Sequence, residues 1–413
     1  MKYGLIGERL SHSYSVEIHS KIADYKYELK ELTPEQVGAF INEKDFLGIN
    51  VTIPYKQTVI PYLDVISERA KSIGAVNTVV NKDGKLYGYN TDFFGLESML
   101  DYNKINVEGK KVLILGTGGT CKTAFSVCRH KEAREIYIVS RTEKDGAISY
   151  ETARNIHADA EIIINTTPVG MYPNVQDCPI DITPFTKLEG VCDCIYRPIN
   201  TNLVSKARER GIKSCTGLYM LVAQGVYASA LFLQKEVDCG IIESTYKQTL
   251  SEKENIVLIG MPSSGKTTVG KALAKALSMN FADCDEKITE KIGISIPEYF
   301  EKYGEAAFRQ VEAETIFELS KLSQTVIATG GGAVLNADNI VALKRNGRII
   351  YIDRPLNLLS VCDASRPLSK SKEAVEKLYV ERKPLYESYC DIRVDGKRSV
   401  EEVTKSIITE MKK

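Results

Sequence analysis

The chain has 413 residues, which is more than a single hydrophobic core usually holds, so at least two domains are expected. Apolar residues make up 43% of it and charged residues 26%, as is ordinary for a globular protein. The 54 basic residues balance the 54 acidic ones, and no basic stripe occurs, so nucleic acid is not an expected partner.

The cysteines and the apolar segments indicate where the protein works. Ten cysteines are scattered without disulfide or zinc spacing, and only Cys192 and Cys194 form a C-x-C, so buried thiols in a reducing cytosol are expected. The N-terminal apolar run is too short for a signal peptide. The longest apolar stretch, 219–233, contains Gln224 and is shorter than the ~20 residues that span a bilayer. We therefore predict a cytoplasmic protein without a membrane partner.

In chain order, the first hundred residues alternate short apolar runs with amphipathic stretches. KYGLIG, GINVTIP and GAVNTVVN are typical of strands, and PEQVGAFINEK is typical of a helix. A second α/β segment opens at KKVLILGTGGT, and residues 218 to about 250 turn helical. The polar stretch QTLSEKEN, 248–255, then precedes a new strand, IVLIG, at which periodicity resets. The pattern predicts an α/β fold throughout and a domain boundary near residue 253.

The strand, glycine turn and helix start at KVLILGTGGTCKTA predict a dinucleotide site. Read as G-x-G-x-x-G/A, the motif places Gly116 and Gly118 in the turn and Cys121 where Gly or Ala is usual. The next strand ends in SRT, so Arg141 stands where an acidic residue would bind a ribose 2′-hydroxyl. An arginine there favours a 2′-phosphate, hence NADP over NAD.

A second glycine loop predicts a nucleoside triphosphate site. Residues 260–267 read GMPSSGKT, which matches G-x-x-x-x-G-K-[ST] between the strand IVLIG and a helix. Backbone N–H groups of such a loop surround phosphates, and the helix N-terminus adds its positive end. Lys266 would reach the β- and γ-phosphates and Thr267 would hold Mg²⁺. The ATP-binding residues predicted here are Gly260, Ser263, Ser264, Gly265, Lys266, Thr267 and Thr268.

Two sets of further motifs carry family resemblances. LSHSYS, GINVTIPYK, GAVNTV, GYNTD and GLYMLVAQG resemble the shikimate dehydrogenase family over roughly residues 3–250. FADCDEKI, GEAAFRQVEAE, ATGGGAV, SRPLS and ERKPLY, behind the glycine loop, resemble the shikimate kinase family from about 254 to 411. The resemblances imply a dehydrogenase-like part, 1–252, whose substrate-binding portion is 1–100 and 218–252 and whose Rossmann-type cofactor portion is 101–217. They imply a P-loop kinase part over 253–413.

The dehydrogenase resemblance implies roles for individual residues. Lys56 and Asp92 would be the catalytic pair, and Ser13 with Ser15 would bind the substrate carboxylate. The residues implied to bind ring hydroxyls are Thr52, Asn77 and Gln224; those implied around NADP are Gly116, Gly118, Gly119, Arg141, Thr142, Tyr196 and Gly217. Plainer interpretations exist, because Ser13, Ser15 and the Asn90–Asp92 segment also suit helix N-caps. His12 is given no role.

The kinase resemblance implies a shikimate pocket and a lid. Asp285 would orient the acceptor hydroxyl, Asp283 would help hold the metal through water, and Arg366 would close over the transferring phosphoryl. The residues implied to bind shikimate are Asp285, Arg309, Gly331 and Arg382. Taken singly, the two aspartates also suit a solvated strand end, and Arg309 with Glu312 suits a helical ion pair.

Two departures from the family patterns stand out. The segment before the predicted lid, NLLSVCDAS, lacks the arginine that many shikimate kinases place near adenine. The segment between SRT and AEIIINTTP is short and broken by Gly146, so the cofactor portion is trimmed on its adenosine side.

The preferred function is NADPH-dependent reduction of 3-dehydroshikimate to shikimate, followed by ATP- and Mg²⁺-dependent phosphorylation of shikimate to shikimate 3-phosphate. Two alternatives stay open. One is a catalytically silent regulator that senses metabolites through the same modules, and the other is an NAD-dependent quinate/shikimate dehydrogenase fused to the kinase. The presence of the catalytic groups favours an enzyme, and Arg141 favours NADP. Oligomeric state is not predicted.

Overall fold

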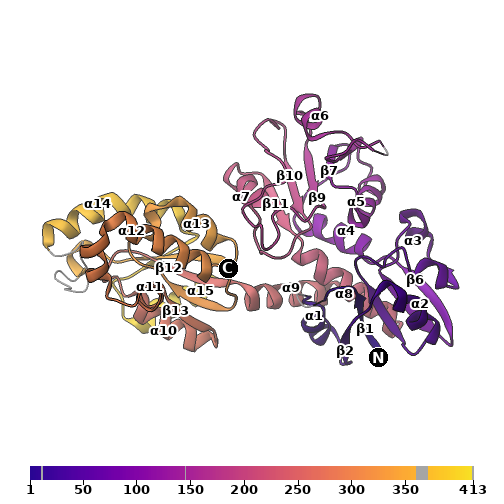
Figure 1. Cartoon of the computed structure of the whole chain (residues 1–413), viewed down its shortest axis with the longest axis horizontal. Coiled ribbons are helices and arrows are strands. Elements are labelled where there is room, and N and C mark those ends of the chain that lie inside the picture. Colours follow the sequence, from indigo (N-terminus) through magenta and orange to yellow (C-terminus); the bar gives the residue numbers. More distant parts are fainter. Residues whose placement is uncertain (11–12, 145, 360–370, 412–413) are drawn as a thin grey trace. The chain divides into compact units, whose positions relative to one another are not determined.

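The computed structural model describes residues 1–10, 13–144, 146–359 and 371–411, and it divides into two compact units, 1–250 and 251–413 (Figure 1). Each unit is an α/β structure. Within the described residues, no helix has both the length and the apolarity needed to cross a bilayer. The first unit contains two sheets and the second contains one.

The first sheet of unit 1 has six strands in the order β2-β1-β3-β5-β6-β4. Its strands are β1 (Tyr3–Gly7), β2 (Tyr27–Glu31), β3 (Gly48–Val51), β4 (Val65–Ile66), β5 (Thr78–Lys82) and β6 (Lys85–Tyr89). β1 pairs in parallel with β2 and β3, whereas β5 pairs antiparallel with β3 and β6. The β5–β6 hairpin turns at Asp83 and Gly84, which both have positive φ as a two-residue Asp-Gly loop requires.

The helices around this sheet begin at polar or proline positions. α2 carries a capping box between Thr33 and Gln36 with a proline in its first turn, and the Ser67 side chain caps α3. The helices are α1 (Ser15–Ile22), α2 (Pro34–Glu43), α3 (Glu68–Ile73) and the short 3₁₀ turn η1 (Ile60–Tyr62).

The second sheet of unit 1 is wholly parallel, in the order β11-β10-β9-β7-β8. Its strands are β7 (Lys111–Leu115), β8 (Glu135–Val139), β9 (Ile162–Asn165), β10 (Gly190–Asp193) and β11 (Lys213–Thr216); its helices are α5 (Gly119–His130), α6 (Tyr150–Asn155) and α7 (Asn202–Glu209). This order is that of a dinucleotide-binding sheet without its third strand, which leaves β8 at the edge. Between β8 and β9 the described helical structure is one short helix, α6.

Alternation along β7 explains why helices cover both faces of this sheet. Val112 and Ile114 face a core shared with α4, α5 and α8, while Leu113 and Leu115 face a core shared with α6 and α7. α4 (Asp92–Tyr102) and α8 (Leu218–Leu233) pack on one another and lie between the two sheets of the unit (Figure 1). The apolar stretch 219–233 is therefore a buried helix.

α9 (Cys239–Lys253) stays helical through most of the polar stretch 248–255 and ends at Lys253, where the sequence analysis placed the domain boundary. Glu, Lys and Gln are good helix formers, so polarity by itself does not end a helix. β12 then begins only two residues after the helix ends, at Asn255.

Unit 2 is built on a parallel sheet in the order β13-β14-β12-β15-β16. Its strands are β12 (Asn255–Ile259), β13 (Asn280–Asp283), β14 (Thr325–Ala328), β15 (Gly347–Asp353) and β16 (Ile392–Asp395). Its helices are α10 (Lys266–Leu277), α11 (Cys284–Ile292), α12 (Ile296–Leu319), α13 (Ala337–Lys344), α14 (Lys372–Tyr389) and α15 (Val400–Met411), with the 3₁₀ turns η2 (Ala333–Leu335) and η3 (Leu356–Leu358).

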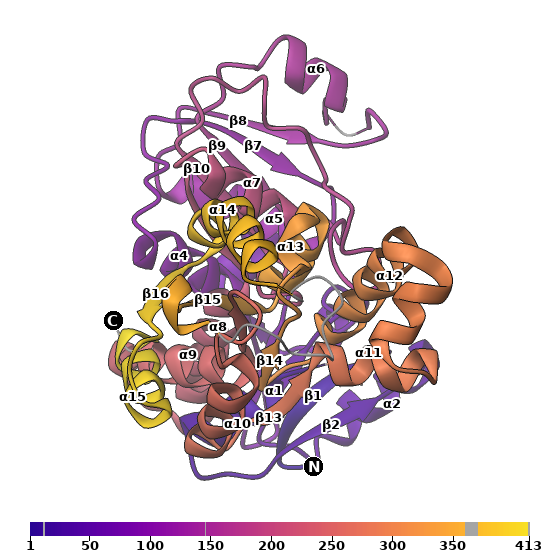
Figure 2. The same ribbon diagram turned by 90° about the vertical axis from the view of Figure 1, so that its left-hand side faces the viewer.

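The residues of β12 again alternate between two cores. Ile256 and Leu258 face α10 and α15, whereas Val257 and Ile259 face α12, α13 and α14. α12 is kinked at Gly304, whose φ is +79°. α11 and α12 lie side by side, on the other side of this unit from α15 (Figure 2).

Candidate active sites

In unit 1, a short ion pair joins two residues that lie on different elements. Lys56 Nζ lies 2.5 Å from Asp92 Oδ2, with side chains that are 19% and 13% exposed. Lys56 lies in the turn after β3, and Asp92 is the first residue of α4. A carboxylate in the first turn is favoured by the helix dipole, so Asp92 suits both the helix and the pair. A lysine held in this way can donate a proton to a neighbouring oxygen.

Backbone bonds hold the segments that carry this pair beside Asn77. Val76 N–H donates to the Lys56 carbonyl at 2.8 Å, and Asn77 N–H donates to the Tyr89 carbonyl at 3.0 Å. The Asn77 side chain is buried; its Oδ1 accepts from Thr91 N–H at 2.7 Å, and its Nδ2 donates to Thr91 Oγ1 at 3.1 Å. The structure therefore brings Lys56, Asn77 and the start of α4 together.

The other residues predicted to bind substrate lie on neighbouring elements. Ser13 Oγ donates to Ser15 Oγ at 2.9 Å and accepts from Ser15 N–H at 3.2 Å, where α1 begins. Gln224 lies on α8 with its Cβ close to Gly95 of α4, one turn after Asp92, and its Nε2 donates to the Leu221 carbonyl. Thr52 follows β3 and packs against Gly7.

The helix-cap interpretation fits part of these segments. Asn90 Oδ1 accepts from Phe93 N–H at 3.2 Å, so Asn90 satisfies a donor in the first turn of α4. The residue at the N-cap position of α1 is Tyr14, whose side chain makes no capping hydrogen bond. Ser13 and Ser15 lie at the start of that helix as a hydrogen-bonded pair of hydroxyls.

The glycine turn after β7 has the geometry that a dinucleotide needs. Gly116 has a φ of +106°, and a Cβ there would lie 2.9 Å from Thr167 Cγ2. Gly118 and Gly119 face open space, since a Cβ on either would meet nothing within 4 Å, and α5 begins there without a side-chain cap. Cys121 is buried, and burial raises the pKa of its thiol to about 11, so the residue is neutral. These observations fit a bound pyrophosphate.

The remaining cofactor residues lie at the carboxyl ends of β8, β10 and β11. Arg141 and Thr142 are exposed just after β8, and Arg141 has no carboxylate within ion-pair distance among the described residues. Tyr196 lies 5.3 Å from Tyr14, measured between ring centroids. Gly217 N–H donates to the Ile195 carbonyl at 2.8 Å, and a Cβ at Gly217 would collide with the Cys194 carbonyl. A guanidinium at the end of β8 fits a 2′-phosphate.

A buried carboxylate anchors the loop that carries Tyr196. Asp193 accepts hydrogen bonds from Asn165 Nδ2, Ile195 N–H and Thr201 Oγ1 at 3.0, 3.0 and 2.7 Å. Burial raises the pKa of Asp193 to about 7, although these three donors act to lower it. Its position in C-D-C-I-Y-R-P drew no attention in the sequence, where only the neighbouring Tyr196 stood out.

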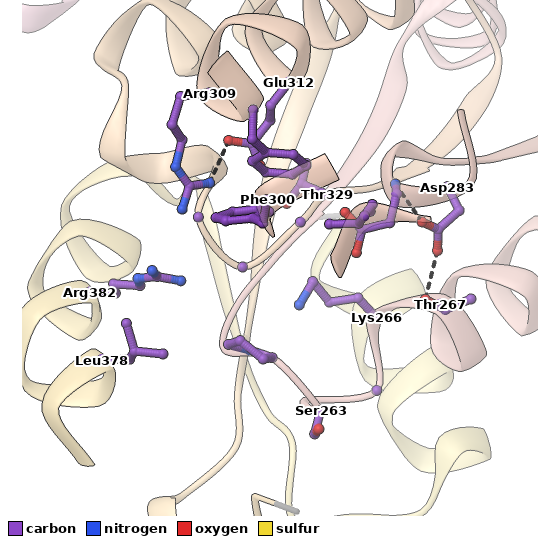
Figure 3. Close-up of a pocket in the computed structure, with 18 of the residues that line it drawn as sticks. Ser263, Lys266, Thr267, Asp283, Phe300, Arg309, Glu312, Thr329, Leu378 and Arg382 are labelled. Carbon is purple, nitrogen blue, oxygen red and sulfur yellow. Dashed lines mark hydrogen bonds and ion pairs between the residues drawn. The ribbon is translucent and has the colours of Figure 1, made fainter. Parts of the chain in front are cut away.

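In unit 2, a cavity of about 350 Å³ lies at the start of α10 (Figure 3). Ser263, Gly265, Lys266, Thr267 and Thr268 line it. Lys266 Nζ donates to the carbonyls of Gly260 and Met261, both at 2.9 Å, so its ammonium is held by the loop it belongs to.

Two residues of the predicted loop do not line the cavity. Ser264 is buried and its N–H donates to the Met261 carbonyl, so it serves the loop itself. Gly260 has a φ of +147° and lies close to the Ile352 carbonyl, which explains the glycine without a ligand contact.

Asp283, the last residue of β13, and Asp285, in the first turn of α11, lie beside the phosphate loop. Thr267 Oγ1 donates to Asp283 Oδ2 at 2.7 Å, and Asp283 Oδ1 accepts from Asp285 N–H at 2.9 Å (Figure 3). Asp285 lines the cavity close to Gly330, whose Cβ would lie 2.9 Å from Asp285 Oδ1. Hydroxyl and carboxylate oxygens beside a phosphate loop fit Mg²⁺, which binds through a few such ligands plus water and phosphate.

Two guanidinium groups point into the same cavity from α12 and α14 (Figure 3). Arg309 Nη1 lies 2.8 Å from Glu312 Oε2, and Glu312 is 1% exposed. Burial raises the pKa of Glu312, although the Arg309 guanidinium acts to lower it. The pKa of Arg309 is also raised, because the carboxylates of Glu312 and Glu305 outweigh the lowering effect of burial. Arg382 is 3% exposed, and its Nε has no hydrogen-bond partner in the described structure. Such a pair can bind a carboxylate.

Three glycines that follow the carboxyl end of β14, Gly330, Gly331 and Gly332, also line the cavity. Gly331 packs on Pro262, its carbonyl accepts from Tyr386 Oη at 2.6 Å, and a Cβ at Gly332 would collide with the Arg309 guanidinium. The apolar wall of the cavity carries no sequence signature, because such residues look like ordinary core in a sequence. The residues of this wall are Pro262, Ile296, Phe300, Phe308 and Leu378, and the polar Thr329 also lines the cavity. Arg366 lies outside the described residues.

Two family models and a curated relative match different parts of the chain. The family model described as shikimate kinase matches residues 262–412, and that of the shikimate dehydrogenase substrate binding domain matches residues 5–79. The chain is 39% identical over 259 residues to the shikimate dehydrogenase (NADP(+)) of Clostridium beijerinckii, covering 59% of this chain and 96% of that protein.

Solved structures resemble the same part of the chain. The crystal structure of shikimate dehydrogenase 1 from Peptoclostridium difficile has a TM-score of 0.56 and 37% identity, and covers 60% of this chain and 98% of that one. Shikimate 5-dehydrogenase from Thermus thermophilus, in complex with NADP(H) and shikimate, has a TM-score of 0.55 and 28% identity, with 60% and 99% covered. The chain therefore belongs to the shikimate dehydrogenase family, and its match to the shikimate kinase model over residues 262–412 supports a bifunctional enzyme of the shikimate pathway.

Proposed function

We propose that unit 1 reduces 3-dehydroshikimate to shikimate with NADPH, and that unit 2 phosphorylates the 3-hydroxyl of shikimate with ATP. The observation that carries the proposal is the coexistence of a Lys56–Asp92 pair of 2.5 Å with a phosphate-loop cavity into which Arg309 and Arg382 point. The division 1–252 and 253–413 is proposed as the boundary between the two activities.

In unit 1, Lys56 supplies the proton of the reduction. Bound NADPH supplies the hydride to the C3 carbonyl carbon. The Lys56 ammonium stabilises the negative charge that develops on the carbonyl oxygen and transfers a proton to it, while Asp92 orients the ammonium. Ser13 and Ser15 bind the carboxylate of the substrate, and Thr52, Asn77 and Gln224 bind its hydroxyls. Asn77 already donates to and accepts from Thr91, so its amide is held in one orientation.

In unit 2, positioning and charge neutralisation dominate. Arg309 and Arg382 bind the shikimate carboxylate, and the buried Glu312 keeps the Arg309 fork in place. Asp285 accepts the hydrogen bond of the 3-hydroxyl and aims its oxygen at the γ-phosphate. Lys266 moves from its loop carbonyls to the phosphates, with Thr267 and Asp283 on the Mg²⁺ side. Arg366 is proposed to close over the transferred group.

The order of the two reactions has a chemical reason. The oxygen that the first reaction converts from a ketone to a hydroxyl, at C3, is the same oxygen that the second reaction phosphorylates. A ketone oxygen cannot accept a phosphoryl group in this way, so reduction must come first.

The test is a coupled assay on the full chain. Purified protein receives 3-dehydroshikimate and NADPH with or without MgATP, and NADPH absorbance and shikimate 3-phosphate are followed. Lys56→Ala and Lys266→Ala are compared with Lys71→Ala on α3 and Lys271→Ala on α10, two exposed lysines that serve as matched controls. We expect Lys56→Ala to abolish only reduction and Lys266→Ala to abolish only phosphorylation of added shikimate.

Other outcomes separate the alternatives. Binding of both substrates without turnover of either would make the chain a metabolite sensor. Oxidation of quinate with NAD⁺ at a higher kcat/KM than that of shikimate with NADP⁺ would make unit 1 a quinate dehydrogenase. Loss of activity in the two control variants would show that the effects are not local.

A further inference from the structure

Unit 1 contains a second concave site, which none of the residues proposed to bind substrate or cofactor lines. We refer to it as the α3–α5 groove, and its volume is about 950 Å³. α3 comes from the portion that carries the first sheet, whereas α5 follows β7 of the second sheet, and the two helices pack on one another. The groove is completed by α4, α8 and the segment after α8, so it is lined from both portions of the unit.

The wall of the groove is aromatic. Phe94 of α4 and Tyr227 of α8 stack with ring centroids 4.7 Å apart and an interplanar angle of 11°. Phe93 lines the groove beside them and meets the His130 imidazole edge-on. Apolar lining area combined with a few polar groups is typical of small-molecule sites.

The charge at the groove is positive and incompletely neutralised. The Arg69 guanidinium lies 3.9 Å over the Phe93 ring and 4.8 Å over the Phe94 ring, and it has no carboxylate within ion-pair distance among the described residues. Lys235 also lacks such a partner there, whereas His130 faces Glu97 at 3.5 Å. Glu68 is the one acidic residue among those that line the groove.

The central carbon of the Arg69 guanidinium lies over both rings, and the N–H groups of the side chain have no carboxylate within ion-pair distance among the described residues, so they can donate to another acceptor. Five donors in a planar fork match the two oxygens of a carboxylate. A planar ring attached to that carboxylate would lie along the aromatic wall, where stacking is favourable. Neither a cation nor an aliphatic polyol satisfies both features.

We infer that the α3–α5 groove binds a small planar aromatic carboxylic acid, whose carboxylate Arg69 receives with help from Lys235 and whose ring packs against Phe94 and Tyr227. Because α3 and α5 belong to different portions of unit 1, a ligand held here contacts both portions. The inference does not depend on the proposed activities, since binding can be measured without turnover.

The test uses 2-naphthoate, which is fluorescent and has no ring hydroxyls for the proposed shikimate sites. The full chain is titrated in the presence of saturating shikimate, beside 2-naphthalenemethanol, which keeps the ring and lacks the carboxylate. The variants are Arg69→Gln and Lys235→Gln, and Lys71→Gln on the same helix α3 is the control because it does not line the groove. Circular dichroism checks that each variant is folded.

We expect the wild type to bind 2-naphthoate with shikimate present. The affinity of Arg69→Gln for 2-naphthoate should be lower by a factor of about ten or more, and that of Lys235→Gln should also be lower. The affinity of Lys71→Gln should equal that of the wild type. The wild type should bind 2-naphthalenemethanol no more tightly than Arg69→Gln binds 2-naphthoate. Equal affinity of the acid and the alcohol, displacement by shikimate, or no binding at the solubility limit would each overturn the inference. So would a change of oligomeric state in Arg69→Gln without probe binding, which would make the groove an interface between copies of the chain. If Arg69→Gln does not fold, Lys235→Gln decides by the same criteria.

Discussion

Thr267 Oγ1 and Asp283 Oδ2 are joined by a hydrogen bond of 2.7 Å, which connects the first turn of α10 to the end of β13. The two residues belong to neighbouring elements around the phosphate loop, and both are oxygen donors of the kind that Mg²⁺ prefers. Asp283 Oδ1 also accepts a hydrogen bond from the backbone N–H of Asp285 at 2.9 Å. One carboxylate thus links the proposed metal side of the site to the residue proposed to orient the acceptor.

Substitution at Thr267 tests this arrangement. Thr267→Val removes the hydroxyl while keeping the shape, and we expect the Mg²⁺ concentration for half-maximal phosphorylation to rise roughly 10- to 100-fold. Thr267→Ser should stay close to the wild type, because it keeps the oxygen. The measurement is kinase rate against Mg²⁺ at fixed ATP, with the dehydrogenase rate of the same preparations as the control. Equal Mg²⁺ dependence in all three proteins would exclude a metal role for Thr267.

Two glycines of unit 1 should respond oppositely to alanine. A Cβ at Gly118 meets nothing within 4 Å, so Gly118→Ala should leave thermal stability unchanged and raise the KM for NADPH, because the methyl group occupies space proposed for pyrophosphate. A Cβ at Gly217 would collide with the Cys194 carbonyl, so Gly217→Ala should lower stability by about 1–3 kcal/mol. Thermal denaturation with NADPH kinetics distinguishes them; a destabilised Gly118→Ala with normal KM would contradict the prediction.

Arg141 should determine the choice between the two nicotinamide cofactors. Its exposed guanidinium has no carboxylate partner among the described residues, so its loss should affect binding far more than folding. Arg141→Ala should lower kcat/KM for NADPH by roughly 10- to 100-fold and leave that for NADH nearly unchanged, since charge-assisted hydrogen bonds contribute about 1.5–3 kcal/mol. Arg154→Ala on α6 is the matched control. A parallel loss with both cofactors would assign Arg141 a structural role.

Asp193 should make the stability of unit 1 depend on pH. Its pKa in the folded state is raised to about 7 by burial, above its ordinary value of 3.8, so the folded state binds the extra proton between about pH 4 and 7. The stability that this group contributes is therefore lost as pH rises through that window, by up to about 4 kcal/mol. Asp193→Asn, which keeps a carbonyl acceptor, should be more stable relative to the wild type at pH 8 than at pH 5.

The measurement is urea unfolding at the two pH values followed by circular dichroism, because the chain has no tryptophan. The transition of unit 1 is the one that NADP⁺ shifts. Thr201→Val, which removes one of the three donors to the carboxylate, is a useful comparison because it should raise the pKa of Asp193 further. A stability difference between Asp193→Asn and wild type that does not change with pH would contradict the assignment.

Local motifs predicted the parts of both sites whose geometry is set within a few residues. A strand followed by glycines and a helix start was recognisable at Gly116–Gly118 and at Gly260–Thr267, because backbone conformation and helix polarity depend on near neighbours. The short connection from β8 to β9 was also recognisable, because the sequence between SRT and AEIIINTTP is shorter than the family pattern. In the structure, β8 is the edge strand of its sheet. The polar stretch 248–255 predicted a domain boundary near residue 253, and α9 ends at Lys253.

By itself, then, the sequence determined the α/β class, the two families and the identities of the charged side chains that their motifs carry. Only the tertiary structure decided that Lys56 and Asp92, 36 residues apart, form an ion pair, that Arg309 is held by a buried Glu312, and that Arg69 lies over aromatic rings in a groove. The physical reason is that these contacts arise where separate helices and strands pack, and packing depends on the whole set of buried side chains at once. Local periodicity carries no record of which distant faces meet.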